Sequence, residues 1–156
     1  TLQIEWHFIG TIQSNKTKNI ALSFDWIHTV DRSKIIERLA EIERSKNLNV
    51  LLQVNIDNSQ TKSGACIEEI SKLAKQIVNT NKLNLRGLMA IPNPISESHL
   101  RNSYKNLFNI FNGMRNNFPN ERIDTLSMGM TNDYKIAIEE GSTIIRIGSG
   151  IFGSRT

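Results

Sequence analysis

The feature that most constrains the fold of this chain is a regular alternation of short apolar segments with segments of helical periodicity. Strands are predicted at residues 4–10, 49–55, 85–91, 124–130 and 143–148, where apolar and β-branched residues dominate. The other predicted segments are helices at 33–45, 67–78, 98–118 and 134–140, a loop or short helix at 13–19, a less regular strand at 21–30 and a helical turn at 149–153. Nearly continuous apolar strands alternating with helices are typical of a parallel sheet covered by helices.

The pattern amounts to six βα-type units without an internal linker or a low-complexity segment. A chain of 156 residues has room for one ordinary domain, so residues 1–156 are predicted to form a single unit. An open doubly wound sheet and a (β/α) barrel both fit this alternation, and periodicity does not choose between them. Either architecture places its ligand site at the carboxyl ends of the strands.

Composition excludes several other classes of protein. With 38% hydrophobic residues, nine Gly and three Pro, the chain is neither collagen-like nor typical of a disordered tail. No apolar run reaches the ~18 residues that a membrane-spanning helix needs. A net charge of +4 spread along the chain is weak evidence for nucleic-acid binding, so neither a membrane nor a nucleic acid is an expected partner.

The single cysteine, Cys66, cannot form a disulfide within the chain, and no Cys/His pairs have zinc-site spacing. We therefore expect no metal, a reducing cytoplasmic location, and a small buried apolar role for Cys66. No secretory leader is visible, and the chain does not begin with Met, so we expect a fragment of a longer chain or a truncated product.

Candidate binding residues follow the last two strands. Gly129 and Gly148 offer backbone N–H groups without a side chain in the way, and Ser127 and Ser149 add hydroxyl groups. The alternative is that these glycines only shape tight turns. Arg146 favours a site, because an Arg within an apolar strand is costly unless it meets an acceptor. If its side of the strand faced solvent, that argument would fail.

Weaker candidates are the histidines and two loop lysines. His7 is expected to be a hydrogen-bonded interior residue rather than a catalytic base, and His28 and His99 to be structural or exposed. Lys16 and Lys62 follow strands and could pair with a phosphate, although solvated lysines are commoner in such loops. No nucleophile–His–Asp arrangement and no Gly-rich nucleotide loop is present.

Taken together, these segments resemble the motifs of the pyridoxal phosphate homeostasis proteins. The motifs occur in the family's order and span nearly the whole chain. They are Trp6-His7-Phe8-Ile9-Gly10 with Gln13, Asn15 and Lys16; Gln53-Val54-Asn55 with Thr61-Lys62-Ser63-Gly64; Arg86 to Pro92; Leu126 to Asp133; Ala137-Ile138 to Thr143; and Arg146-Ile147-Gly148 to Ile151-Phe152-Gly153-Ser154-Arg155.

The resemblance implies a fold, a cofactor and a site. The fold would be a (β/α)8 TIM-type barrel like the N-terminal domain of alanine racemase, of which this chain contains about strands 3–8. The cofactor would be pyridoxal 5′-phosphate, with Arg146 near the pyridine nitrogen, where a permanent positive charge keeps that nitrogen unprotonated. The residues implied in phosphate binding are Ser127, Met128, Gly129, Gly148 and Ser149.

The resemblance also implies a role and what is missing. The family has no established catalytic activity; it buffers pyridoxal phosphate and delivers it, with dependent apoenzymes as recipients, and we expect a monomer. Its Schiff-base lysine lies on the first barrel strand, before residue 1 of this chain, so any binding here would be non-covalent. Six barrel strands cannot close, which predicts two unpaired sheet edges and exposed core surface.

Two other functions remain open at this point. The first is an enzyme, either a racemase-like protein that uses pyridoxal phosphate or another phosphate-handling barrel, which would need a proton donor and a proton acceptor on opposite faces of the cofactor. The second is a binding or scaffold protein without any cofactor.

Overall fold

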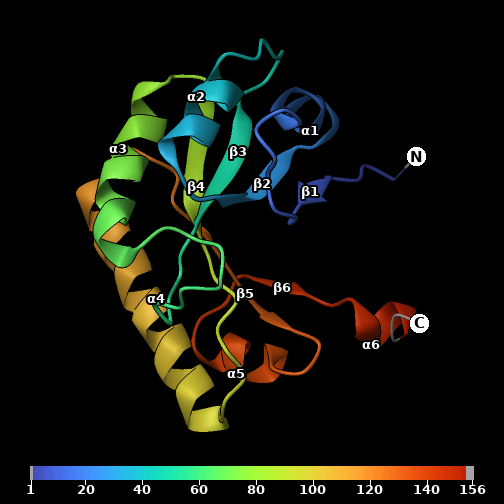
Figure 1. Cartoon of the computed structure of the whole chain (residues 1–156), viewed down its shortest axis with the longest axis vertical. Helices are drawn as coiled ribbons and strands as arrows, with labels where there is room; N and C mark the ends of the chain where they lie inside the picture. The colour runs from blue at the N-terminus through green and yellow to red at the C-terminus, as the bar shows by residue number, and fades with distance from the viewer. Residues whose placement is uncertain (1, 154–156) are drawn as a thin grey trace.

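The computed structural model describes residues 2–153, which form one curled parallel sheet with its helices (Figure 1). The elements in chain order are β1 (His7–Phe8), α1 (Thr17–Ser23), β2 (Trp26–Val30), α2 (Ser33–Ala40), β3 (Leu48–Gln53), the 3-10 turn η1 (Ile67–Glu69), α3 (Ile70–Asn79), β4 (Leu83–Met89), α4 (Glu97–Asn117), β5 (Thr125–Met130), α5 (Tyr134–Glu139), β6 (Ile144–Arg146) and α6 (Ser149–Phe152).

The strand order distinguishes the two architectures that the sequence left open. Within the described residues the strands follow one another as β1-β2-β3-β4-β5-β6, and each neighbouring pair is parallel. A doubly wound sheet reverses its order at a switch point, whereas a βα barrel adds each strand beside the previous one. The order therefore confirms the partial barrel.

The two faces of the sheet bury different sets of residues. The outer face packs against the helices through apolar side chains such as Ile27, Leu52 and Leu126, all fully buried in the main core. The inner face holds a small separate cluster of Trp26, Leu51 and Met89. Polar residues share this inner face, and they form the site described below.

Helix ends follow from local chemistry. The Ser96 hydroxyl caps α4 by accepting the backbone N–H of His99 at 3.1 Å. Gly141 follows the cap of α5 with φ of +96°, a left-handed conformation that favours glycine directly after a helix. Figure 1 shows α3 and α4 flanking the strands on one side, with both termini on the other side.

Several predicted boundaries and burials are wrong. Residues 21–23 end helix α1 instead of starting a strand, and α2 stops at Ala40 rather than at residue 45. The helical pattern of residues 98–118 also predicts an inward-facing Phe108, but this side chain is 36% exposed where it lies beside Gly141. Cys66 was predicted to be buried but is exposed, since it caps the short η1 turn at the surface.

The sheet has two unpaired edges, as predicted for six barrel strands. β1 and β6 stand at the ends of the strand order and are not neighbours in the described structure. Large apolar side chains lie exposed near both edges: Leu2, Ile4 and Trp6 beside β1, and Ile145, Ile151 and Phe152 beside β6. In the described part of the chain, no helix combines the length and apolarity needed to cross a membrane.

Candidate functional site

A cavity of about 430 Å³ opens where β4, β5 and β6 end at their carboxyl termini. One wall is apolar and includes Ile91, Pro92 and Leu100. The polar part of the lining consists of Tyr104, Thr131, Asp133, Arg146, Gly148 and Ser149, together with Lys62. A cavity of this kind suits a small ligand with an apolar body and an anionic group.

Arg146 is the last residue of β6, and its guanidinium has fixed partners. One terminal nitrogen donates to Ser127 Oγ at 2.6 Å, and the other donates to the Ala90 carbonyl oxygen at 3.0 Å. Burial lowers the pKa of Arg146 from its ordinary value, while Tyr104 and Asp133 favour the charged form. The side chain has five N–H donors, so donors remain for a ligand in the cavity. Arg146 therefore meets acceptors within the protein, a serine hydroxyl and a backbone carbonyl, and its contact with a ligand stays a prediction.

Tyr104 and Asp133 form a hydrogen-bonded pair in the lining of the cavity, with Tyr104 buried and Asp133 half-buried. The Tyr104 hydroxyl donates to Asp133 Oδ2 at 2.6 Å, and Asp133 Oδ1 accepts the backbone N–H of Met130 at 2.6 Å. Burial and the Asp133 carboxylate raise the pKa of Tyr104 far above its ordinary value. The hydroxyl therefore stays protonated and engaged, and it is unsuited to act as a base. Sequence reasoning did not select either residue, because α4 and the β5 loop meet only in the fold.

Thr131 connects the loop after β5 to the turn that begins α6. Its hydroxyl oxygen accepts the N–H groups of Gly148 and Gly150, each at 3.3 Å. Thr131 lies in the resembling motif but was not selected as a site residue; its position directly after β5 was the available signal.

The predicted site residues separate into two groups. Arg146, Gly148 and Ser149 line the cavity, as the sequence suggested. Ser127 is fully buried on the inner face, and its hydroxyl bonds Arg146 and His28. Ser127 therefore contacts the site through Arg146.

Met128 and Gly129 lie behind the cavity. The Met128 side chain is fully buried in the outer core. Gly129 has φ of +92°, and a Cβ atom there would lie 2.5 Å from Ala137 Cβ. The glycine thus permits close packing of β5 against α5, and neither residue lines the cavity.

The three histidines have structural contacts, as the sequence analysis expected. His7 is half-buried and its Nδ1 lies 2.8 Å from His28 Nε2, while the His7 ring stacks on Trp26 at 5.2 Å. His28 is buried, and burial lowers its pKa to about 3. His99 lies on α4, away from this pair, with Nε2 3.2 Å from Asp57 Oδ1.

Of the two loop lysines, only Lys62 reaches the cavity. Its ammonium donates to the Ile91 carbonyl oxygen at 2.9 Å and lies 3.9 Å from Asp57 Oδ2. Asp57 also accepts the Ser103 hydroxyl at 3.1 Å, which ties the loop after β3 to α4. Lys16 is exposed at the start of α1.

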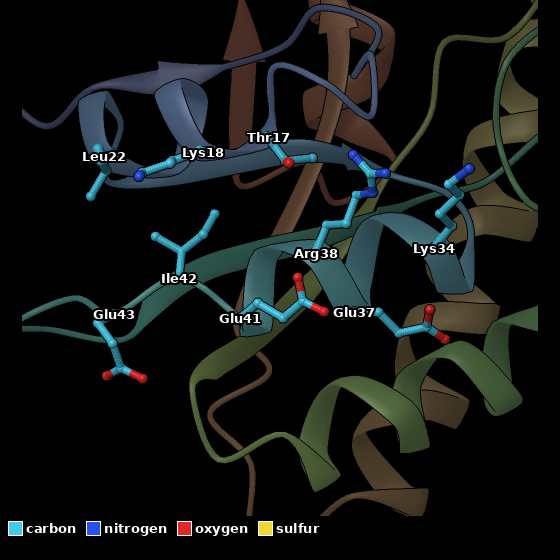
Figure 2. A pocket seen from close by; sticks show the side chains of 9 residues that line it. All are labelled: Thr17, Lys18, Leu22, Lys34, Glu37, Arg38, Glu41, Ile42 and Glu43. Carbon is cyan, nitrogen blue, oxygen red and sulfur yellow. The ribbon is translucent and has the colours of Figure 1, made fainter.

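Another hollow lies between α1 and α2, and Figure 2 shows its charged lining. Lys18, Lys34 and Arg38 line it together with Glu37, Glu41 and Glu43, so its charges are balanced. Arg38 is engaged with the Ser14 carbonyl oxygen. This hollow is formed by helices and lacks the fixed donors of the strand-end cavity.

A curled parallel sheet with a cavity at its strand ends defines the class of βα-barrel proteins, and comparison with known proteins leads to the same class. Residues 3–156 match the family model of the alanine racemase N-terminal domain, and the chain belongs to this family. Within it, the chain belongs to the pyridoxal phosphate homeostasis proteins. A protein of that name from Haemophilus influenzae is 49% identical over 158 residues, which cover 99% of this chain and 66% of the relative.

Solved structures give the same result. The structure of PipY from Synechococcus elongatus without PLP superposes with a TM-score of 0.90 at 31% identity, covering 96% of this chain and 71% of PipY. The structure of PipY with PLP bound gives a TM-score of 0.83 at 30% identity and the same coverage. The chain thus spans about two thirds of the length of the relatives it matches.

Proposed function

We propose that this chain binds pyridoxal 5′-phosphate non-covalently and takes part in pyridoxal phosphate homeostasis without catalysing a reaction. The observation that carries the proposal is the strand-end cavity, in which Arg146 and the Gly148–Ser149 turn lie on one wall. A relative of the same family, PipY, has been solved with PLP bound.

The residues present fit this ligand. Gly148 and Ser149 line the cavity and would hold the phosphate. Residues 127–129 do not line it, so they would support the phosphate site only from behind. The apolar wall of Ile91, Pro92 and Leu100 would pack against the ring, and Arg146 would hold the ring nitrogen.

The chemistry of the site favours binding over catalysis. Bound pyridoxal phosphate supplies a reactive aldehyde and a ring that can withdraw electrons. Arg146 keeps its positive charge, so it disfavours a proton on the ring nitrogen and weakens the ring as an electron sink. Tyr104, a titratable residue of the cavity lining, is held protonated by burial and by Asp133. These features argue against the racemase-like alternative.

The test is retention of pyridoxal phosphate by the purified chain during gel filtration, measured by absorbance and by ³¹P NMR. We expect retention by the unmodified chain and loss from the double variant Ser127→Ala, Arg146→Ala. The matched control is Lys16→Ala, which changes an exposed lysine at the start of α1, outside the cavity, and should leave binding normal. Equal retention by all three proteins would contradict the proposal, and exchange of an amino-acid α-proton would favour the enzyme.

The partners follow from the same proposal. We propose that the chain acts in the reducing cytoplasm as a monomer and passes pyridoxal phosphate to apoenzymes that need it. The open cavity and the lone exposed Cys66 are compatible with this role. Activation of an apoenzyme by the loaded chain, faster than by pyridoxal phosphate released into solution, would support it.

A further inference from the structure

Four side chains cross the inner face of the sheet in one continuous line of hydrogen bonds. Arg146 on β6 contacts Ser127 on β5, Ser127 contacts His28 on β2, and His28 contacts His7 on β1. The three distances are 2.6, 2.9 and 2.8 Å. This line joins the cavity to the opposite edge of the sheet.

The direction of each bond follows from what each group can donate. Arg has donors only, so Ser127 Oγ accepts from Arg146. The Ser127 hydroxyl is fully buried, and His28 Nδ1 is the acceptor within its reach among the described residues. If His28 Nδ1 carried a proton instead, the Ser127 O–H would be buried without an acceptor, at a cost of about 1–3 kcal/mol.

The proton positions on both imidazoles are then determined. His28 accepts at Nδ1, so as a neutral ring it carries its proton at Nε2 and donates to His7 Nδ1. His7 is then neutral, with its proton at Nε2. The surroundings agree with two neutral rings: burial lowers the pKa of His28, and the neighbouring His7 and Arg146 lower it further. Burial also lowers the pKa of His7, although Glu5 and Asp25 oppose this.

We propose that His28 is a positioning residue, which holds the Ser127 hydroxyl so that its oxygen is turned toward Arg146 and fixes the guanidinium at the wall of the cavity. Without the His28 acceptor, the Ser127 hydroxyl can rotate and offer its proton toward Arg146, which cannot accept it. Only the expected effect on affinity for pyridoxal phosphate rests on the proposed function; the arrangement of the side chains does not.

The direct test needs no ligand and no variant. Long-range ¹H–¹⁵N NMR of the ¹⁵N-labelled chain at neutral pH reports which ring nitrogens carry protons. We expect His28 to be protonated at Nε2 alone and His7 to have an unprotonated Nδ1. A proton on His28 Nδ1 would overturn the proposal. Failure to bind pyridoxal phosphate would leave this result unchanged and would count against the proposed function alone.

Two variants test the effect on the site. His28→Asn places an amide oxygen near the position of Nδ1, so it keeps an acceptor for Ser127 while losing the bond to His7. His28→Leu removes both. We expect the affinity for pyridoxal phosphate to fall about tenfold or more in His28→Leu and to be largely restored in His28→Asn. Equal affinities of the two variants, both folded by circular dichroism, would contradict a positioning role.

Discussion

The hydroxyl of Tyr104 on α4 donates a 2.6 Å hydrogen bond to the carboxylate of Asp133, which follows β5. Tyr104 is 1% exposed, and Asp133 uses its second oxygen to accept the Met130 N–H. One buried bond therefore connects the longest helix to the loop that contains Thr131 and forms a wall of the cavity.

Tyr104→Phe should lower both stability and affinity. The change removes a buried hydrogen bond to a charged group, which contributes roughly 1.5–3 kcal/mol. We expect the urea midpoint to fall accordingly and pyridoxal phosphate to bind more weakly, because the loop is no longer fixed. Tyr134→Phe is the matched control, since Tyr134 is the chain's second tyrosine and does not line the cavity. Equal losses in both variants would refute a special role for the Tyr104 bond.

Alanine substitution should lower stability at Gly129 and ligand affinity at Gly148. At Gly129 the positive φ and the 2.5 Å approach to Ala137 Cβ leave no room for a methyl group. We expect Gly129→Ala to reduce the free energy of unfolding by at least about 2 kcal/mol. At Gly148 a Cβ atom would meet nothing within 4 Å, so Gly148→Ala should leave stability unchanged and reduce ligand affinity. Thermal melts and ligand titrations of both variants distinguish these outcomes; a stable Gly129→Ala protein would show that the packing is misjudged.

Arg146→Lys should weaken binding although the charge is kept. The guanidinium donates to Ser127 and to the Ala90 carbonyl at the same time, which a single ammonium cannot do with the same geometry. We expect the Kd for pyridoxal phosphate to rise about tenfold or more, measured by fluorescence titration. An unchanged Kd would show that only the charge matters at this position.

The free energy of unfolding should begin to fall as pH drops below 6.5, before most carboxylates titrate. The pKa of His28 is lowered from 6.5 to about 3, so the neutral ring is favoured in the folded state and the unfolded chain takes up the proton first. The stabilisation is complete above pH 6.5 and is lost as pH falls toward 3, by up to about 1.4 kcal/mol per pH unit. Charged groups also surround the two hydrogen-bonded histidines. Arg146 lies beside His28, while Glu5 and Asp25 lie beside His7.

Urea unfolding at pH 6.5, 5.5 and 4.5 measures how the free energy of unfolding changes with pH. This dependence should be weaker in His28→Asn. Asp124→Asn serves as the control: the pKa of Asp124 is lowered mainly by its bonds to Arg86 and Thr125, against the effect of burial, so its contribution is lost only below about pH 4. An identical slope in His28→Asn and the unmodified chain would contradict the assignment.

The sequence predicted the parts of the fold that depend on local pattern. Strands β3 and β5 and helix α4 lie within a few residues of their expected positions, because their apolar residues are dense or periodic. Cys66 and Phe108 were misplaced, since their exposure depends on which neighbours cover them and not on residue type.

The site was predictable only where residues are close in sequence. Arg146, Gly148 and Ser149 lie within four residues at the end of β6, and residue chemistry together with the family resemblance selected them; the structure places all three in the cavity lining. The line from Arg146 to His7 could not be predicted, because the contact between His28 and Ser127 joins residues 99 positions apart. Their proximity depends on the curl of the whole sheet, which no local pattern specifies.

The most direct test of the account is a crystal structure of the chain soaked with pyridoxal 5′-phosphate. We predict that the phosphate lies against Gly148 and Ser149, that the ring packs against Ile91, Pro92 and Leu100 with its nitrogen at Arg146, and that Arg146 keeps its bond to Ser127. Pyridoxal phosphate bound elsewhere, or an Arg146 side chain turned out of the cavity, would contradict it.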